Sequence, residues 1–334
     1  MLRFHSANLG CKMWTEISTK ITQVTGKVFE IVERKSLSGG CINQVYLISN
    51  NTDRYLLKLN QPSLIEMFVA EAAGLSEISL TDAINIPTPI CDGVTREHSY
   101  LVLEYLDLTT RVTTQSWTEM GRNLAMMHRH QISSESKFGW QIDNTIGSTA
   151  QINTWESDWA TFFTQHRIGY QLQLALSKGG DFPRAAELLV IIPQILCEHH
   201  PQPSLVHGDL WSGNASFTTT GIPVIFDPAT YWGDREVDIA MTELFGGFPA
   251  AFYQGYNDVY PLDPGYSQRK NLYNLYHILN HYNLFGGSYQ SQANSSIESI
   301  LSTVNCLNGF RASTTRTLKH DPREEKVRNK NCEQ

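Results

Sequence analysis

The chain has 334 residues, of which 41% are hydrophobic and 18% are charged, and this composition predicts two globular domains or one large two-lobed domain. Its formal net charge of −7 argues against a general nucleic-acid-binding surface. No apolar run is long enough to cross a bilayer and no secretion signal is evident, so we expect no membrane partner.

The first hundred residues predict β-strands arranged around one helix. Short runs rich in β-branched and aromatic residues give four candidate strands, at residues 28–38, 44–49, 54–60 and 99–106. Residues 62–80 combine Ala, Leu, Glu and Met, and Pro62 suits the first turn of a helix. The helix is therefore expected between the third and fourth strands.

After Leu106 the sequence becomes mainly helical. The candidate helices lie at residues 117–131, 153–177, 182–200 and 271–285. Pro193 predicts a kink or break in the third of them, and the polar, charge-dense segment from Ser313 predicts a disordered tail. We therefore predict an α+β fold with a β-rich lobe at residues 1–105, a helical lobe at 106–312 and the tail at 313–334.

The stretch HGDLWSGN, from His207 to Asn214, carries the first candidate chemistry. Asp209 and Asn214 fit the D-x-x-x-x-N loop of the phosphoryl-transfer template, in which the aspartate accepts a hydroxyl proton and the asparagine binds magnesium. Asp227 follows an apolar run and fits the second magnesium ligand, although a simple β-turn would explain it alone. Together these residues indicate a kinase site for ATP and magnesium. An aspartate near its ordinary pKa of about 3.9 is ionised at neutral pH, so Asp209 needs no shift.

Lys58 and Glu71 are candidates for the ion pair that orients the nucleotide phosphates. Glu71 shares one helix face with the apolar residues Phe68 and Leu75, and a charge on an apolar stripe is costly unless it is paired. Lys58, on the preceding predicted strand, is the natural partner. The alternatives are a solvated Glu71 at the margin of the stripe and a Lys58 at an exposed strand edge.

Two further segments fit a nucleotide site by their position. Gly39 and Gly40 lie in a turn between the first two predicted strands, where backbone amides can approach phosphate, although an ordinary hairpin turn is the alternative. Glu104, Tyr105 and Leu106 lie where the composition changes. Their backbone is a candidate for holding the adenine edge, and a plain connector is the alternative.

The combined motifs resemble the fructosamine-3-kinase, or ketosamine-3-kinase, family within the aminoglycoside-phosphotransferase-like kinases. HGDLWSGN is followed by FDPATYWGDREVDIAM and LFGGF, and the similarity includes NTIGSTAQINTWESDWATFFTQHRIGYQLQLA and LYHILNHYNLFGGSY. It extends from roughly Gly39 to Tyr289, and the sequence after Phe310 contains no matching motif. The resemblance implies a bilobal protein-kinase-like fold.

The resemblance also implies an activity and a role for each candidate. The family phosphorylates the 3-hydroxyl of ketosamines, which are ribulosamine, erythrulosamine or fructosamine adducts on amines or protein lysines, and the product then loses its sugar. The activity is therefore a repair of glycation. Asp209 is similar to the catalytic base and Asp238 to the aspartate that steadies the catalytic loop. The other assignments are magnesium ligands at Asn214 and Asp227, the ion pair at Lys58 and Glu71, and the adenine hinge at Glu104, Tyr105 and Leu106.

Trp211 and His281 are candidates for contact with the acceptor. Trp211 occupies the position of the family's characteristic tryptophan, where an indole can stack on a sugar and gain roughly 0.5–2 kcal/mol from an amine cation. A buried core tryptophan is the alternative. His281 is expected to reach the sugar, whereas His207 is expected to brace its loop as a hydrogen-bond donor. His199 is expected at an exposed helix end.

The six cysteines lie far apart and form no C-x-x-C pair. We therefore expect neither a zinc site nor a disulfide framework, and we predict a cytoplasmic location. Cys41, in the glycine turn, is a candidate redox thiol whose oxidation would block the loop or link two chains. A monomer and a redox-linked homodimer are both compatible with this, and a small residue in a hairpin turn is the alternative.

Two other functions are weighed against the ketosamine kinase. One is a small-molecule kinase of the same fold that acts on another hydroxyl substrate, such as an aminoglycoside, choline or homoserine. The tryptophan of LWSGN and the FGG segments argue against it. The other is a non-catalytic nucleotide-binding module, and the presence of candidates for the base, the lysine and the metal ligands argues against that.

Overall fold

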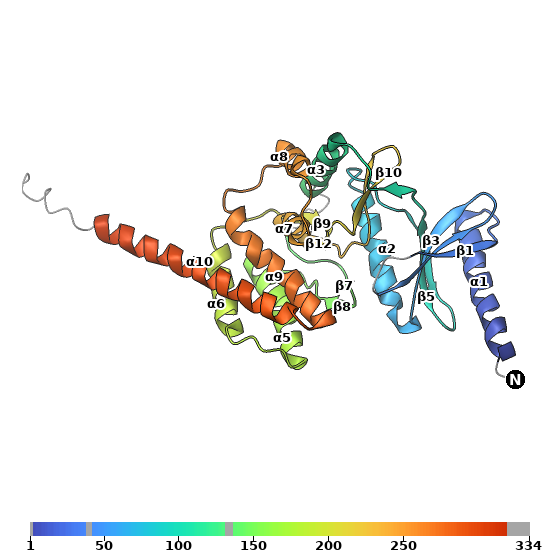
Figure 1. The fold of residues 1–334 in the computed structure, drawn as a ribbon, viewed down its shortest axis with the longest axis horizontal. Coiled ribbons are helices and arrows are strands. Elements are labelled where there is room, and N and C mark those ends of the chain that lie inside the picture. The colour runs from blue at the N-terminus through green and yellow to red at the C-terminus, as the bar shows by residue number, and fades with distance from the viewer. Residues whose placement is uncertain (1–2, 38–41, 131–135, 319–334) are drawn as a thin grey trace, which may run out of the picture.

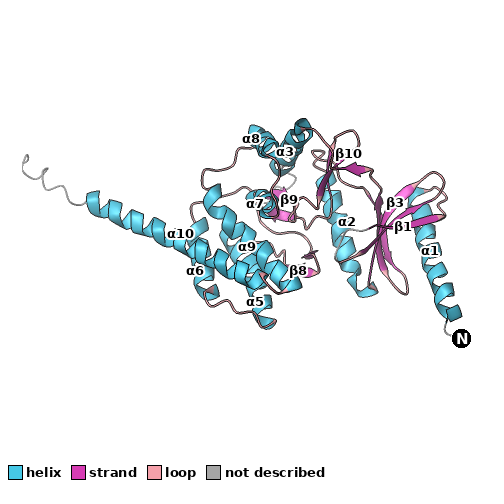
Figure 2. Ribbon diagram, viewed as in Figure 1, coloured by secondary structure: helices cyan, strands magenta, loops and turns pink. Residues whose placement is uncertain are grey.

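The computed structural model describes residues 3–37, 42–130 and 136–318. A β-rich part is followed by a mainly helical part, so the predicted α+β organisation is confirmed (Figure 1, Figure 2). The glycine turn with Gly39, Gly40 and Cys41 lies outside the described residues. None of the helices in the described residues is both long enough and apolar enough to cross a membrane.

Five antiparallel strands form the sheet of the β-rich part, in the order β1-β2-β3-β5-β4. Their bounds are β1 Glu33–Leu37, β2 Gln44–Ser49, β3 Arg54–Asn60, β4 Pro89–Val94 and β5 Ser99–Glu104. In the centre of the sheet, Lys58 on β3 pairs with Val45 on β2 and Leu101 on β5. The alternative of Lys58 at an exposed edge is therefore wrong. The sequence does not predict β4, because Pro89 and Gly93 are poor strand formers.

Helix α1 (Arg3–Thr25) covers one face of the sheet and is not predicted from the sequence (Figure 1). Its buried residues Met13, Ile17 and Ile21 recur every four positions and pack in one cluster with Leu57 of β3. Several Thr, Ser and Ile residues lower the helix propensity of this segment. Packing of the apolar stripe outweighs that local preference.

Helix α2 (Ile65–Ser79) covers the other face of the sheet and follows the short 3-10 helix at Pro62–Leu64. Phe68 and Leu75 of α2 pack against Leu101 of β5. Paired residues on neighbouring strands point to the same face of a sheet. Lys58, the partner of Leu101, therefore points to the face that α2 covers.

The rest of the chain is mainly helical. The helices are α3 Thr114–Arg129, α4 Trp159–Phe162, a π-helix Phe163–Gly169, α5 Tyr170–Ser177, α6 Ala185–Leu196, α7 Glu236–Leu244, α8 Ala250–Val259, α9 Tyr266–Phe285 and α10 Tyr289–Leu318. The predicted break at Pro193 is absent, because α6 continues through it. Helix α10 also runs past Ser313 into the predicted tail, and it extends away from the rest of the molecule (Figure 1).

Short strands in the helical part hold its loops in place. They are β6 Leu108–Thr109, β7 Asn144–Ile146, β8 Thr149–Gln151, β9 Ser204–Val206, β10 Ala215–Thr218, β11 Pro223–Ile225 and β12 Tyr231–Gly233. The pairs β9–β12 and β10–β11 bring the two segments 207–214 and 226–230 together. These segments contain four of the predicted site residues, namely Asp209, Trp211, Asn214 and Asp227.

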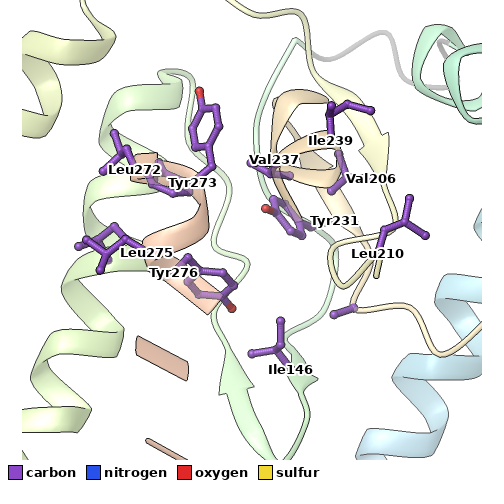
Figure 3. Packing of buried hydrophobic residues seen from close by; sticks show 14 of the residues in the cluster. Ile146, Val206, Leu210, Tyr231, Val237, Ile239, Leu272, Tyr273, Leu275 and Tyr276 are labelled. Atoms are coloured by element: carbon purple, nitrogen blue, oxygen red, sulfur yellow. The ribbon is translucent and has the colours of Figure 1, made fainter. Parts of the chain in front are cut away.

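The core of the helical part is rich in aromatic side chains. Tyr273 and Tyr276 of α9 lie opposite Tyr231 of β12 (Figure 3). Val206 and Leu210, on either side of the segment 207–209, are buried in the same cluster. Apolar packing therefore anchors the segment at both ends, in addition to the contacts of its polar groups.

Candidate active site

A cavity of about 480 Å³ lies between the sheet and the helical part, and its size is typical of a site for a small ligand. Its lining includes seven of the residues predicted from the sequence, namely Lys58, Glu71, Asp209, Trp211, Asn214, Asp227 and His281. Residues far apart in the chain thus face one space. Glu104, Tyr105 and Leu106 are not among the lining residues of this cavity.

Lys58 is a buried cation between two carboxylates. Its Nζ lies 2.6 Å from Oε1 of Glu71 and 2.5 Å from Oδ1 of Asp227, and the side chain is 4% exposed. Burial acts to lower the pKa of Lys58, but the two carboxylates outweigh it and raise the pKa above its ordinary value. Lys58 therefore stays charged at neutral pH, and the predicted contact with Glu71 is present. A solvated Glu71 is excluded.

Asp238 of α7 fixes the backbone of the segment that precedes Asp209. Its two carboxylate oxygens accept hydrogen bonds from the N–H groups of His207, at 2.7 Å, and Gly208, at 2.8 Å. Gly208 has a φ of 81°, and a Cβ there would lie 2.1 Å from the carbonyl oxygen of Ala229. Only glycine fits this position, and Asp238 gives the loop the support expected from the sequence.

His207 joins the two loops of the site. It is fully buried, and its Nδ1 accepts the N–H of Asp209 at 3.2 Å while its Nε2 donates to the carbonyl oxygen of Phe226 at 2.9 Å. Burial lowers the pKa of His207, so the ring is neutral at pH 7. The predicted bracing role agrees with this geometry, and both ring nitrogens are occupied.

Asp209 is more perturbed than the sequence predicts. Its Oδ2 accepts a hydrogen bond from Nδ2 of Asn214 at 3.2 Å, and its main-chain oxygen accepts from the same nitrogen at 2.9 Å. Burial and the charge of Asp227 raise the pKa of Asp209 to about 7, although the hydrogen bond from Asn214 opposes the change. The sequence argument that Asp209 needs no shift took no account of burial or of a second carboxylate nearby.

Asn214 and Asp227 offer oxygen atoms that suit a hard divalent cation. Asn214 uses its amide nitrogen on Asp209, which leaves its amide oxygen as a ligand. Asp227 uses one carboxylate oxygen on Lys58, and its side chain is 47% exposed. Its φ of 58° turns the backbone sharply after β11. The repulsion between the carboxylates of Asp209 and Asp227 is what a cation would relieve, so the residues fit magnesium.

Aromatic rings line one wall of the cavity, and they come from the loop after β9, the end of α7, α9 and the start of α10. Trp211 is 36% exposed and contacts Phe245 at 6.2 Å between ring centroids. Phe245 in turn contacts His281 at 4.9 Å, and His281 contacts Tyr289 at 5.1 Å. The alternative of a buried core tryptophan is therefore wrong. This wall can contact a ligand through ring faces, whereas the polar part of the cavity can contact it through charged groups.

The family of the chain follows from comparison with known proteins. The family model described as fructosamine kinase matches residues 13–303. The chain belongs to the fructosamine kinase family. A Synechocystis protein named probable ketoamine kinase slr1563 is 55% identical over 288 residues, which cover 86% of this chain and 97% of that protein.

Solved structures agree with this membership. A Haemophilus somnus crystal structure that carries the name of a fructosamine-3-kinase has a TM-score of 0.80 and 36% identity, and the match covers 85% of this chain and 96% of that chain. A mutant aminoglycoside phosphotransferase solved with ADP and hygromycin B has a TM-score of 0.58 and 17% identity, over 86% and 98% of the two chains. The second likeness concerns the fold alone and confirms the predicted protein-kinase-like architecture.

The segment predicted as the adenine hinge begins at Glu104, the last residue of β5. The N–H of Glu104 donates to the carbonyl oxygen of Thr88 at 2.8 Å, and its carboxylate accepts from the Thr88 hydroxyl at 2.8 Å. A hinge contact from Glu104 would therefore use its carbonyl oxygen. Tyr105 lies beneath the guanidinium of Arg54, 5.0 Å from ring centroid to Cζ. The adenine contact of Glu104, Tyr105 and Leu106 stays a prediction.

Two features of the site are not predicted from the sequence. Glu77 of α2 accepts hydrogen bonds from Nε1 of Trp140 at 2.5 Å and Nε1 of Trp232 at 2.9 Å, and both indoles are buried. These bonds tie the helix that carries Glu71 to the helical part of the molecule. The second feature is His277 of α9, whose Nδ1 lies 4.0 Å from Oδ1 of Asp209.

His199 differs from its expected position. It is buried, and its Nε2 lies 2.7 Å from Oδ2 of Asp234, so the prediction of an exposed helix end is wrong. Tyr273 of α9 donates to the same carboxylate oxygen at 2.6 Å. Hydrogen bonds to Asp234 hold the end of α6 against α9, a tertiary contact that no local pattern in the sequence indicates.

Proposed function

We propose that the protein uses ATP to phosphorylate the 3-hydroxyl of ketosamines and thereby repairs glycation. Its substrates would be ribulosamine, erythrulosamine or fructosamine adducts on small amines or protein lysines. The observation that carries the proposal is one cavity that combines the Lys58–Glu71 ion pair, Asp209 and the exposed ring of Trp211. The names of the Synechocystis and Haemophilus relatives support this choice of acceptor.

The nucleotide would bind on the side of Lys58. We assign the ATP phosphates to Lys58, which Glu71 holds in place at 2.6 Å. Asn214 and Asp227 would hold magnesium, which would supply positive charge to neutralise the phosphates. The proposal extends the phosphate contacts to Gly39 and Gly40, and the adenine contacts to the segment 104–106.

Asp209 would accept the proton of the sugar hydroxyl. Because its pKa is raised to about 7, it is a stronger base than an ordinary aspartate and can still ionise near neutral pH. The position of Asn214 on Oδ2 leaves Oδ1 for the proton. Asp238 and His207 would act only by holding the backbone around Asp209.

Trp211 and His281 would bind the ketosamine. The exposed indole offers a face for the sugar C–H groups and for the cation of the secondary amine. His281 donates from Nδ1 to the carbonyl oxygen of His277 at 2.8 Å, which leaves Nε2 for the sugar. The cytoplasmic location and the redox role of Cys41 stay predictions, and gel filtration with and without oxidant tests the monomer against a linked homodimer.

A panel of acceptors tests the proposed function. ATP consumption is measured with magnesium and ribulose-lysine, fructose-lysine, choline or kanamycin, together with a mixture that lacks an acceptor. We expect turnover with at least one ketosamine and little with choline or kanamycin. Turnover with only choline or kanamycin would reassign the protein to another small-molecule kinase. ATP binding without turnover of any acceptor would indicate a non-catalytic module.

A further inference from the structure

His277 is a buried polar residue that lacks a hydrogen-bond partner beside the proposed base. It is 4% exposed, and its ring forms no hydrogen bond with any residue that the structure describes. Its Nδ1 lies 4.0 Å from Oδ1 of Asp209. Neither ring nitrogen is among the fully enclosed polar atoms that lack a partner, so each keeps a small accessible surface where a bound group can satisfy it.

The two oxygens of Asp209 have different surroundings. Oδ2 accepts from Asn214, whereas Oδ1 accepts no hydrogen bond from the described residues and faces His277. A distance of 4.0 Å is too long for a direct hydrogen bond between Nδ1 and Oδ1. An oxygen placed between the two atoms can lie within about 2.8 Å of each of them. A hydroxyl oxygen that reached this position would therefore be held by two hydrogen bonds.

We propose that His277 is a catalytic residue that donates a hydrogen bond from Nδ1 to the acceptor hydroxyl while that hydroxyl donates its proton to Oδ1 of Asp209. The inference rests on the proposed function and names the position of the reacting oxygen within it. Two hydrogen bonds to one oxygen fix both its location and the direction of its proton.

The charge state of His277 suits this role. Burial lowers the pKa of His277 to about 3, with a further contribution from His281, so the ring is neutral at the pH of the reaction. A neutral imidazole carries a proton on one nitrogen and can donate it without competing with Asp209 as a charged acid. The backbone of His277 is held as well, because its carbonyl oxygen accepts from His281.

The proposed step is balanced in atoms and charge. The O–H bond of the acceptor breaks, its proton moves to Asp209, and the oxygen forms a bond to the γ-phosphorus of ATP. The bond from that phosphorus to the β–γ bridging oxygen breaks, and its electrons leave with ADP. His277 keeps its proton throughout and serves to hold the attacking oxygen.

Three substitutions of His277 distinguish the contributions of its two ring nitrogens from the contribution of the ring's bulk. In His277→Asn the amide nitrogen occupies the place of Nδ1, in His277→Gln it occupies the place of Nε2, and His277→Leu removes both. The readouts are kcat and KM for ketosamine and ATP, together with Tm. We expect His277→Leu and His277→Gln to lower kcat roughly 10- to 100-fold, as loss of a hydrogen bond near a developing charge does. The KM for ATP should be unchanged, and His277→Asn should retain most of kcat.

A packing control and a second reaction complete the experiment. Leu275→Ala removes buried bulk from the same helix and should lower Tm while it leaves kcat per folded molecule unchanged. Slow ATP hydrolysis without ketosamine places water where the acceptor would lie, and it should show the same order among the variants.

Ketosamine turnover by the wild type with an unchanged kcat in all three variants overturns the role of His277 alone. Rescue by Gln and not by Asn overturns the assignment to Nδ1. Absence of ketosamine turnover, with His277-dependent ATP hydrolysis, overturns the proposed function alone.

Discussion

The two sides of the cavity are built from different kinds of contact. On the nucleotide side, Lys58 is buried between the carboxylates of Glu71 and Asp227 at 2.6 and 2.5 Å. On the acceptor side, Trp211 and His281 are held by ring contacts of about 5 to 6 Å and stay partly exposed. The first side is fixed by its own charges before a ligand binds. The second offers surfaces that a ligand would complete.

This difference predicts that substitutions on the two sides will have different effects on ligand binding and stability. A change on the nucleotide side should alter ATP binding or the protein's stability, because it leaves a buried charge without its partner. A change on the acceptor side should alter ketosamine binding with little cost in stability. Asp209 lies between the two sides and should affect neither binding event.

Asp209→Asn should have the largest effect on turnover. Loss of a general base lowers kcat by about 10²- to 10⁴-fold. The affinity for magnesium-ATP should be retained, because Lys58, Asn214 and Asp227 are unchanged. Stopped-flow or coupled-assay kinetics and nucleotide titration measure the two quantities. A kcat near that of the wild type would contradict the role of Asp209 as the base.

Lys58→Met should break the nucleotide side. It removes the cation from two carboxylates, and loss of one partner from a buried pair costs about 3–5 kcal/mol of stability. The KM for ATP should rise while the KM for ketosamine changes little. Chemical denaturation and steady-state kinetics measure these effects.

The double variant Lys58→Met, Glu71→Gln is the matched control. It removes the charge that the single substitution leaves buried at Glu71, so part of the stability should return. ATP binding should not return with it, because the phosphates still lack their cation. If stability and ATP binding recover together, Lys58 supports the fold rather than the phosphates.

Trp211→Ala should act only on the acceptor side. Loss of the indole face should raise the KM for ketosamine about 2- to 30-fold, the equivalent of a cation–π contact. Magnesium-ATP affinity should be nearly unchanged, and Trp211→Phe should give a smaller change because a ring remains. Equal losses of ketosamine and nucleotide binding would contradict the separation of the two sides.

The sequence predicts the contacts whose signal is local. Glu71 lies on an apolar helix stripe, and this pattern requires a nearby cation, which Lys58 supplies. The loop from Asp209 to Asn214 is recognisable because its spacing is short and continuous. Helix α1 is not predicted, because its apolar stripe competes with residues of low helix propensity.

Contacts that depend on three distant segments cannot be predicted in this way. Glu77 meets Trp140 and Trp232 only because α2 packs on the helical part, and no spacing in the chain relates them. The raised pKa of Asp209 depends on burial and on Asp227, which the fold brings near. His277 follows the helical pattern of α9, so the sequence alone cannot distinguish it from a core residue. Only the structure shows that it lies close to Asp209.

Glu77→Gln should have the smallest effect and tests how the two sides are joined. A glutamine at position 77 can accept from one indole N–H, but its amide nitrogen opposes the other, so one buried donor loses its partner at a cost of about 1–3 kcal/mol. Because α2 also carries Glu71, the KM for ATP should rise modestly while the KM for ketosamine stays unchanged.

The control variants remove an indole N–H donor that faces residue 77, whereas Glu77→Gln removes an acceptor. Adding Trp140→Phe or Trp232→Phe to Glu77→Gln deletes one indole N–H, so the double variant should lose less stability than the sum of the two single variants. Chemical denaturation of all four proteins in each cycle measures the coupling. Additive losses would mean that Glu77 does not hold the indoles together. The ketosamine KM could instead rise more than the ATP KM. That result would mean that the hydrogen bonds of Glu77 with Trp140 and Trp232 position the aromatic wall rather than the ion pair.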